Sequence, residues 1–175
     1  MKKIWIIGSS CSGKTTLGRM LMDLTGAPLI DLDDLYWFPN WVEKSDEEFT
    51  KDVDLVLDKP AWIVAGNYGA VLGERPKQAD LIIYLNYSLP TILKRFIKRS
   101  FTRVVLKEPC CNGNYESFAD LFLKKDGLFW WILSTWRQRH TRSLAFIADQ
   151  DKHSYSFHEI SSRSQLVRFL EEFRG

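Results

Sequence analysis

An eight-residue segment near the start of the chain has the residue types and spacing that hold phosphate groups. Gly8 to Thr15 reads GSSCSGKT and matches the pattern G-x-x-x-x-G-K-[ST]. In such a loop, backbone N–H groups surround a phosphate, glycines permit the tight backbone, and the next helix adds positive partial charge at its N-terminus. Lys14 can then bridge the β- and γ-phosphates, and the Thr15 hydroxyl can bind Mg²⁺. The segment predicts a site for ATP or a related nucleoside triphosphate with Mg²⁺.

The nucleotide-binding residues expected from this motif are Gly8, Ser9, Ser10, Cys11, Ser12, Gly13, Lys14, Thr15 and Thr16. The alternative is an accidental glycine-rich turn, which is disfavoured because the pattern falls between an expected strand and an expected helix. Cys11 is expected to be a small filler rather than a nucleophile.

Three carboxylates and a cluster of aromatic rings follow the phosphate loop. Asp31, Asp33 and Asp34 come just after an apolar run, and ligands of open α/β sheets bind at the carboxyl ends of strands. Strand alternation would place Asp31 and Asp33 on one side and Asp34 on another. Solvated turn residues are the alternative, because Asp is common in turns. The nearby rings, which could stack on a planar acceptor or simply pack in the core, are Tyr36, Trp37, Phe38, Trp41 and Tyr68.

The elements that must position these residues alternate between short apolar runs and longer segments of helical period. We expect strands over 3–7, 28–32, 61–65, 80–85 and 155–160, and a helix directly after the phosphate loop. Further helices should begin at Ser45, Ser88 and Ser162, the first and last with capping-box spacing. A helical stripe of aromatic and aliphatic residues runs from Phe118 to Trp136. The pattern predicts an α/β three-layer sandwich around a five-stranded parallel sheet.

Length and composition indicate one domain over residues 1–175. The chain is 45% hydrophobic and 26% charged, enough for one core and too short for two ordinary domains. The apolar-rich stretch over 128–136 is much shorter than the roughly 20 residues of a membrane span, so no membrane span is expected. Three cysteines form neither a disulfide framework nor a zinc pattern, which favours the cytoplasm.

Positive charge is concentrated in one segment. The net charge is +2, but residues 94–142 carry +7 and the rest −5. Such an excess attracts phosphate-bearing molecules, whether nucleotides or nucleic acid. Arg95 and Arg99 share one helix face, and Arg137 follows the aromatic stripe.

The sequence resembles the nucleoside-monophosphate-kinase-like P-loop proteins, and within them the adenylate-kinase-related group labelled FlaR-like or DNA topology modulation proteins. The resemblance covers nearly the whole chain and rests on Gly8 to Thr15, Leu32 to Trp37 with Trp41, Trp62 to Tyr68, and Asn112 to Phe118. It implies transfer of the γ-phosphoryl group of ATP, with Mg²⁺, to a small acceptor, of which a nucleoside monophosphate is one candidate.

The resemblance also implies roles for individual residues. In similar kinases, an acid at the position of Asp33, or else Asp31, contacts the acceptor hydroxyl or the magnesium shell, Asp31 through a water. Residues that follow the third strand grip the acceptor, here Asn67 and Tyr68. The family often has an acid where this chain has Ala65. Asp31 or Asp33 would then have to position a water molecule bound to the metal ion.

Arginines flank a mobile lid in similar kinases. By that resemblance, residues 100–118 are expected to form the lid, with Asn112 to Asn114 as its flexible tip. Arg95, Arg99 and Arg137 would stabilise the transferring phosphoryl group together with Lys14. Taken singly, each arginine could also belong to a solvated helix face.

Two other functions remain open from the residues alone. One is a nucleotide-gated regulatory protein associated with DNA topology, which would bind nucleic acid through the basic segment. The other is a degraded kinase that hydrolyses ATP slowly. The acceptor and the oligomeric state are not determined by the sequence.

Overall fold

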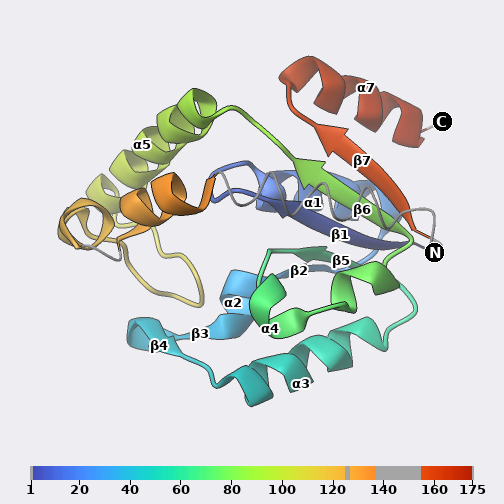
Figure 1. The fold of residues 1–175 in the computed structure, drawn as a ribbon, viewed down its shortest axis with the longest axis horizontal. Coiled ribbons are helices and arrows are strands. Elements are labelled where there is room, and N and C mark those ends of the chain that lie inside the picture. The colour runs from blue at the N-terminus through green and yellow to red at the C-terminus, as the bar shows by residue number, and fades with distance from the viewer. Residues whose placement is uncertain (1, 125–126, 137–154, 175) are drawn as a thin grey trace.

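A parallel sheet of five strands forms the centre of the computed structural model, which describes residues 2–124, 127–136 and 155–174 (Figure 1). The strands are β1 (Lys3–Gly8), β2 (Leu29–Asp31), β5 (Trp62–Ala65), β6 (Leu81–Leu85) and β7 (Ser156–Ile160). Their order across the sheet is β2-β5-β1-β6-β7, and all pairs are parallel. The five strands and the parallel sheet expected from the sequence are confirmed.

The central strands are apolar along nearly their whole length because both faces of the sheet are covered. Alternate residues of β1 serve two separate cores. Ile4 and Ile6 pack with Leu21 and Phe96 on one face, whereas Trp5 packs on the other. The expected three-layer arrangement is therefore present.

Helices cover both faces (Figure 1). On the side of Ile4 and Ile6 lie residues of α1 (Lys14–Thr25), α5 (Leu89–Val105) and α7 (Arg163–Arg174). On the side of Trp5 lie residues of α3 (Asp46–Leu57) and α4 (Gly69–Leu72), with the short helix η2 (Arg75–Gln78) nearby. No helix among residues 2–124, 127–136 and 155–174 has the length and apolar character to cross a membrane.

The helix starts that the sequence indicates are found in the structure. Ser45 accepts a hydrogen bond from the backbone N–H of Glu48 and donates one to its carboxylate, at 3.3 and 2.7 Å. Ser162 accepts from the backbone N–H of Gln165 at 3.2 Å. Ser88 precedes α5 but its hydroxyl contacts that of Thr91, 2.9 Å away. Helix α5 continues to Val105, so the first six residues of the segment expected to be a lid are helical.

The chain between β2 and α3 departs from the expected strand. Strand β2 ends at Asp31, whose carboxylate accepts a hydrogen bond from the backbone N–H of Asp33 at 3.1 Å and so caps helix α2 (Leu32–Tyr36). The strand alternation expected for Asp31, Asp33 and Asp34 was therefore wrong. A small antiparallel hairpin follows, made of β3 (Trp37–Phe38), η1 (Pro39–Trp41) and β4 (Val42–Glu43).

The stripe from Phe118 to Trp136 is divided between two helical pieces. The first contains η3 (Ala119–Leu123), which has π-helical hydrogen bonding, and the second spans residues 128–136. Gly127 lies between them, and a Cβ atom there would meet the carbonyl oxygens of Asp120, Leu121 and Lys124 at 2.7–2.9 Å. This close approach of two backbones requires glycine.

Candidate active site

The phosphate loop joins the end of β1 to the start of α1, where parallel sheets bind ligands. A Cβ on Gly8, at φ 153°, would lie 2.8 Å from the Ser12 hydroxyl and 2.9 Å from the carbonyl oxygen of Leu85. Gly13 has φ 100°, which side chains disfavour. Lys14 Nζ donates to the carbonyl oxygens of Gly8 and Ser9, each 3.1 Å away. The lysine therefore lies over the loop in which phosphates would be held.

The side chain of Asn67 extends the sheet beyond β5. The N–H of Gly66 donates to the carbonyl of Ile6 at 3.0 Å, as in a ladder of parallel strands. One step further, Asn67 Oδ1 accepts from the N–H of Gly8 at 3.0 Å, and Asn67 Nδ2 donates to the carbonyl of Gly8 at 2.7 Å. The amide thus replaces a peptide group and braces the first residue of the phosphate loop. Its expected contact with the acceptor stays a prediction.

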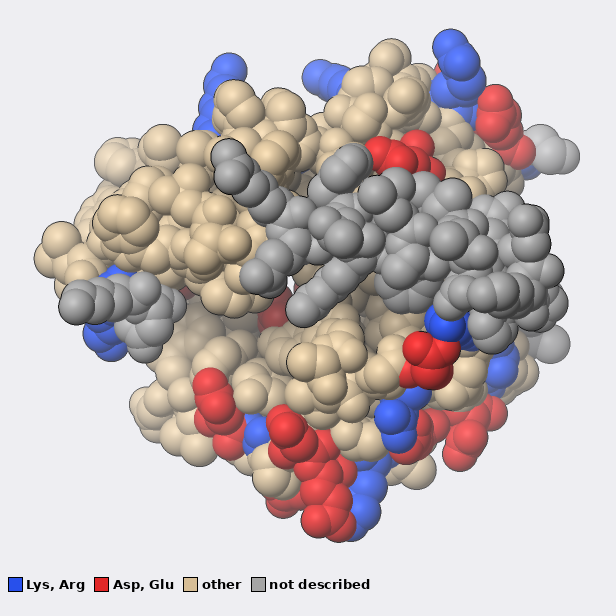
Figure 2. Space-filling model, in the orientation of Figure 1, with Lys and Arg blue, Asp and Glu red and all other residues tan. Residues whose placement is uncertain are grey.

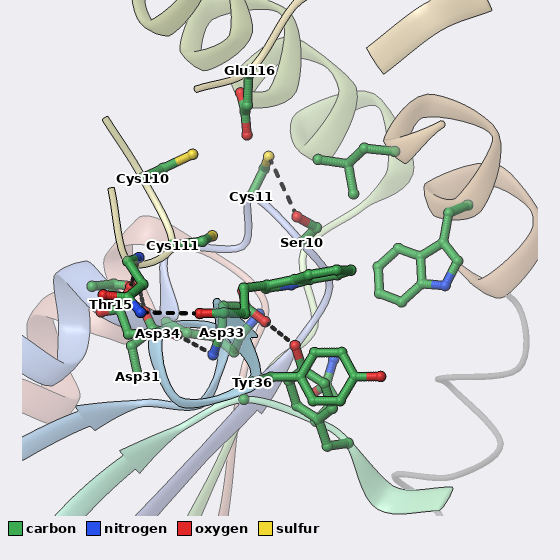
Figure 3. A pocket seen from close by; sticks show the side chains of 18 of the residues that line it. Ser10, Cys11, Thr15, Asp31, Asp33, Asp34, Tyr36, Cys110, Cys111 and Glu116 are labelled. Carbon is green, nitrogen blue, oxygen red and sulfur yellow. Dashed lines mark hydrogen bonds between the residues drawn. The ribbon is translucent and has the colours of Figure 1, made fainter. Parts of the chain in front are cut away.

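Thr15 and Asp31 supply neighbouring oxygen atoms below the phosphate loop (Figure 3). The Thr15 hydroxyl donates to Asp31 Oδ2 at 2.6 Å. Burial, and then the charge of Asp33, raise the pKa of Asp31, while the hydrogen bond from Thr15 lowers it. Hydroxyl and carboxylate oxygens suit Mg²⁺, which commonly takes one or two protein oxygens and completes its shell with phosphates and water. The donor set therefore fits a magnesium ion bound together with a nucleotide.

Asp33 lies beside Asp31 but has a different partner. Tyr68 Oη donates to Asp33 Oδ1 at 2.7 Å. Burial and the neighbouring Asp33 carboxylate raise the pKa of Tyr68, so its hydroxyl remains a donor. Of the residues that the structure describes, none donates to Asp33 Oδ2. That oxygen can accept a proton from a bound hydroxyl group.

The arginines of α5 divide into two roles. Arg95 Nη1 donates to the carbonyl of Ser12 at 2.7 Å, and its guanidinium stacks 4.0 Å from the centre of the Tyr87 ring. It supports the phosphate loop and is not among the residues that line the cleft described below. Arg99 and Arg103 do line that cleft. Arg137 lies outside the described residues, so its role stays a prediction.

Glu116 is a site residue to which the sequence assigned no role. Its Oε1 accepts from Arg103 at 2.8 Å and from Arg99 at 3.4 Å, and only 6% of its side chain is exposed. Its other oxygen, Oε2, is buried without a hydrogen-bond partner. An acid within a strongly basic segment was the signal that could have identified it.

The turn expected to be a flexible tip is hydrogen-bonded to the β3–β4 hairpin region. Cys110 and Asn114 form a two-way backbone bridge, with both hydrogen bonds 2.7 Å long. Asn114 accepts from the N–H of Trp41 at 2.8 Å and donates to the carbonyl of Phe38 at 2.9 Å. Asn112 donates to the carbonyl of Trp37 at 3.2 Å. In this conformation the turn and the hairpin are connected parts of one wall.

Most of these groups line one open cleft of about 1840 Å³. Figure 2 shows a hollow between the helix over 128–136 and α2, with acidic atoms visible inside it. Figure 3 shows Thr15, Asp31, Asp33 and Glu116 around this space, from three different parts of the chain. The expected nucleotide residues that line it are Gly8, Ser10, Cys11, Gly13, Lys14, Thr15 and Thr16. Asp31, Asp33, Asp34, Asn67 and Tyr68 line it as well.

The sheet order and the phosphate loop define an α/β P-loop protein with the nucleoside-monophosphate-kinase-like fold. No family model matches the chain. A shikimate kinase from Psychrobacter cryohalolentis is 24% identical over 190 residues, which cover 99% of this chain and 91% of the relative.

Two solved structures have the same fold. A deoxyadenosine kinase from M. mycoides with bound dATP matches with a TM-score of 0.54 and 13% identity, over 99% of this chain and 100% of that one. A shikimate kinase from Acinetobacter baumannii in complex with shikimate matches with a TM-score of 0.51 and 17% identity, over 99% and 90%. At these identities the structural likeness establishes the fold.

Proposed function

We propose that this protein is an ATP- and Mg²⁺-dependent phosphotransferase that moves the γ-phosphoryl group to a hydroxyl group of a small acceptor. One observation carries the proposal. The phosphate loop, with the Thr15–Asp31 pair beneath it, opens into the same cleft as Asp33, which keeps one carboxylate oxygen for an acceptor. Phosphoryl transfer needs this juxtaposition of a triphosphate site and an acceptor site.

On the nucleotide side, backbone N–H groups of the loop and the Lys14 ammonium would hold the β- and γ-phosphates. Lys14 would exchange its two carbonyl contacts for phosphate oxygens. Thr15, with Asp31 through a water, would hold Mg²⁺, which when bound offsets the negative charge of the phosphates. Arg95 keeps the loop in place through the Ser12 carbonyl.

On the acceptor side, Asp33 would orient the attacking hydroxyl and take its proton. The oxygen of the acceptor forms a bond to the γ-phosphorus while the bond from that phosphorus to the β–γ bridging oxygen breaks, and ADP leaves. Tyr68 holds Asp33 in place by its hydrogen bond to Oδ1. Arg99 and Arg103 line the same cleft and can approach the transferring group when Glu116 releases them.

The names of the relatives support transfer to a small acceptor. The Psychrobacter relative is a shikimate kinase, and the M. mycoides structure is of a deoxyadenosine kinase. The more specific membership, in the FlaR-like group, rests on the four sequence segments that carry the resemblance and is part of the proposal. A cytoplasmic location is also part of the proposal, because the three cysteines do not form a disulfide framework.

The test separates nucleotide binding from transfer. Lys14→Ala should abolish or greatly weaken ATP binding in calorimetry, whereas Lys51→Ala, an exposed lysine on α3, should not. Asp33→Asn should depress ADP formation with an acceptor far more than it weakens ATP binding. Unchanged ATP affinity in Lys14→Ala would refute the nucleotide site. Equal losses of turnover and ATP affinity in Asp33→Asn would refute its acceptor role.

A further inference from the structure

The end of the cleft formed by α2 and the β3–β4 hairpin is lined by three acids. Asp33, Asp34 and Glu43 line the cleft there, on α2 and on the β4 strand of the hairpin. Asp34 accepts a hydrogen bond from the N–H of Asn112 at 3.3 Å. Within the part of the chain that the structure describes, no lysine or arginine forms an ion pair with any of these three acids. Their negative charge is therefore left to act on whatever binds beside them.

The described cations that line the cleft belong to the phosphate loop and α1 or already form ion pairs. Lys14 and Arg19 belong to the phosphate loop and α1. Arg99 and Arg103 share Glu116, and Lys124 pairs with Asp120 at 2.7 Å. Among the described residues, these cations therefore leave the three acids beside the hairpin without an ion-pair partner.

The same end of the cleft has two indole rings that the core does not use. Trp37 and Trp41 line the cleft with their ring centroids 5.5 Å apart, and neither belongs to the two buried clusters. Tyr36, by contrast, packs against Phe49 in the core. Trp41 is 37% exposed.

The orientation of Trp41 is fixed before any ligand binds. Its backbone N–H donates to Asn114, and its indole N–H donates to the carbonyl of Tyr115 at 3.0 Å. Because both N–H groups of Trp41 are already hydrogen-bonded, its ring presents an apolar surface in a fixed orientation. A planar group could stack on this surface with little loss of side-chain entropy.

We propose that the phosphoryl acceptor is a nucleoside, a planar base joined to a hydroxyl-bearing sugar with no negative charge, rather than a nucleoside monophosphate or a carboxylic acid. The base would stack on the Trp37 and Trp41 rings, and a sugar hydroxyl would reach Asp33. A phosphate or carboxylate on the acceptor would meet Asp34 and Glu43 and be repelled. This inference rests on the proposed function and specifies the substrate class of the same site.

The experiment compares acceptors that differ in charge. The intact protein with ATP and Mg²⁺ is offered adenosine, guanosine, cytidine and thymidine, each beside its 5′-monophosphate, and also shikimate. ADP formation and the phosphorylated product are measured, and nucleoside binding is followed separately by quenching of tryptophan fluorescence. We expect at least one nucleoside to be used with kcat/KM about tenfold or more above that of its monophosphate and of shikimate.

The outcomes separate this inference from the proposed function. Efficient phosphorylation of shikimate or of a monophosphate, with nucleosides poor, would overturn the acceptor class and leave the phosphotransferase intact. Saturable nucleoside binding without ADP formation from any acceptor would support the acceptor site and count against the phosphotransferase. Failure of every nucleoside to bind would overturn the inference.

Two variants test the physical causes. The double variant Asp34→Asn with Glu43→Gln removes two charges but keeps amide groups of the same shape. It should raise kcat/KM for monophosphates several-fold relative to nucleosides, and an unchanged ratio would refute the electrostatic argument. Trp37→Ala should weaken nucleoside binding about tenfold, as loss of a stacking ring does elsewhere. Trp130→Phe, a change at a 49% exposed ring outside the cleft lining, is the matched control.

Discussion

Replacement of Asn67 by alanine should weaken the support of the phosphate loop without removing a group expected to contact phosphate. The amide makes two hydrogen bonds, both to the backbone of Gly8. After the change, the N–H of Gly8 has no partner, whereas its carbonyl keeps the Lys14 ammonium at 3.1 Å. An unpaired buried donor costs about 1–3 kcal/mol, and loss of one of two acceptor bonds costs about 0.5–1 kcal/mol.

The expected total is about 2 kcal/mol, because Gly8 borders the open cleft and water can partly replace the lost partner. If the loop stays in place, the cost lowers the free energy of unfolding. If the loop loosens, the cost appears as weaker triphosphate binding, up to about thirtyfold. Urea unfolding and calorimetry with a non-hydrolysable ATP analogue measure the two parts, and their sum should be near 2 kcal/mol.

Two further variants make this prediction refutable. Asn67→Asp can still accept from the N–H of Gly8, but its carboxylate faces the carbonyl, so its loss should equal or exceed that of alanine. Asn86 also follows a parallel strand and makes two side-chain hydrogen bonds, to Tyr84 and Glu159. Asn86→Ala should therefore leave ATP binding unchanged. An Asn67→Ala variant with normal stability and ATP affinity but a raised KM for the acceptor would refute the role of Asn67 in supporting the phosphate loop.

Two predictions concern charged pairs. Glu116→Gln should tighten triphosphate binding several-fold, because Arg99 and Arg103 are released toward the phosphates. The same change should lower the free energy of unfolding by about 1–2 kcal/mol. Calorimetry and urea unfolding measure the two effects, and weaker binding with unchanged stability would contradict the prediction. Hydrogen bonds from Arg75 hold the pKa of the half-exposed Asp54 below its ordinary value, so the pair stabilises the fold above about pH 4 and loses this effect as the pH falls. Asp54→Asn should lower the free energy of unfolding by at most about 1 kcal/mol at pH 7. In urea unfolding, the difference in this free energy between the variant and the unchanged protein should shrink toward pH 2. A constant difference across that range would exclude the ion pair as its cause.

The sheet could be predicted from the sequence because its signals are local. Buried parallel strands must be apolar on both faces, so β1, β5 and β6 stand out as short apolar runs. The capping serines before α3 and α7 also act within one helical turn. The motif of the phosphate loop is a continuous segment for the same reason.

The rest of the site depends on contacts between distant segments. Asn67 bonds a residue 59 positions away, and nothing local distinguishes it from an acceptor ligand. The docking of Asn114 on Trp41 spans 73 positions. Glu116 is recognisable as a site residue only when α5 brings Arg99 and Arg103 beside it. The break in the aromatic stripe likewise arises where Gly127 meets carbonyl groups of the preceding turn.

The missing acid at Ala65 does not by itself argue against catalysis. Asp31 and Ala65 are partners in the register of β2 and β5, so their side chains start from adjacent strands about 4.8 Å apart. An acid at position 65 would therefore lie beside Asp31, where burial and Asp33 already raise the pKa. A second carboxylate would disfavour ionisation further. Because the Thr15 hydroxyl bonds Asp31 directly, we expect the single acid on β2 to suffice for the proposed metal site without an acid on β5.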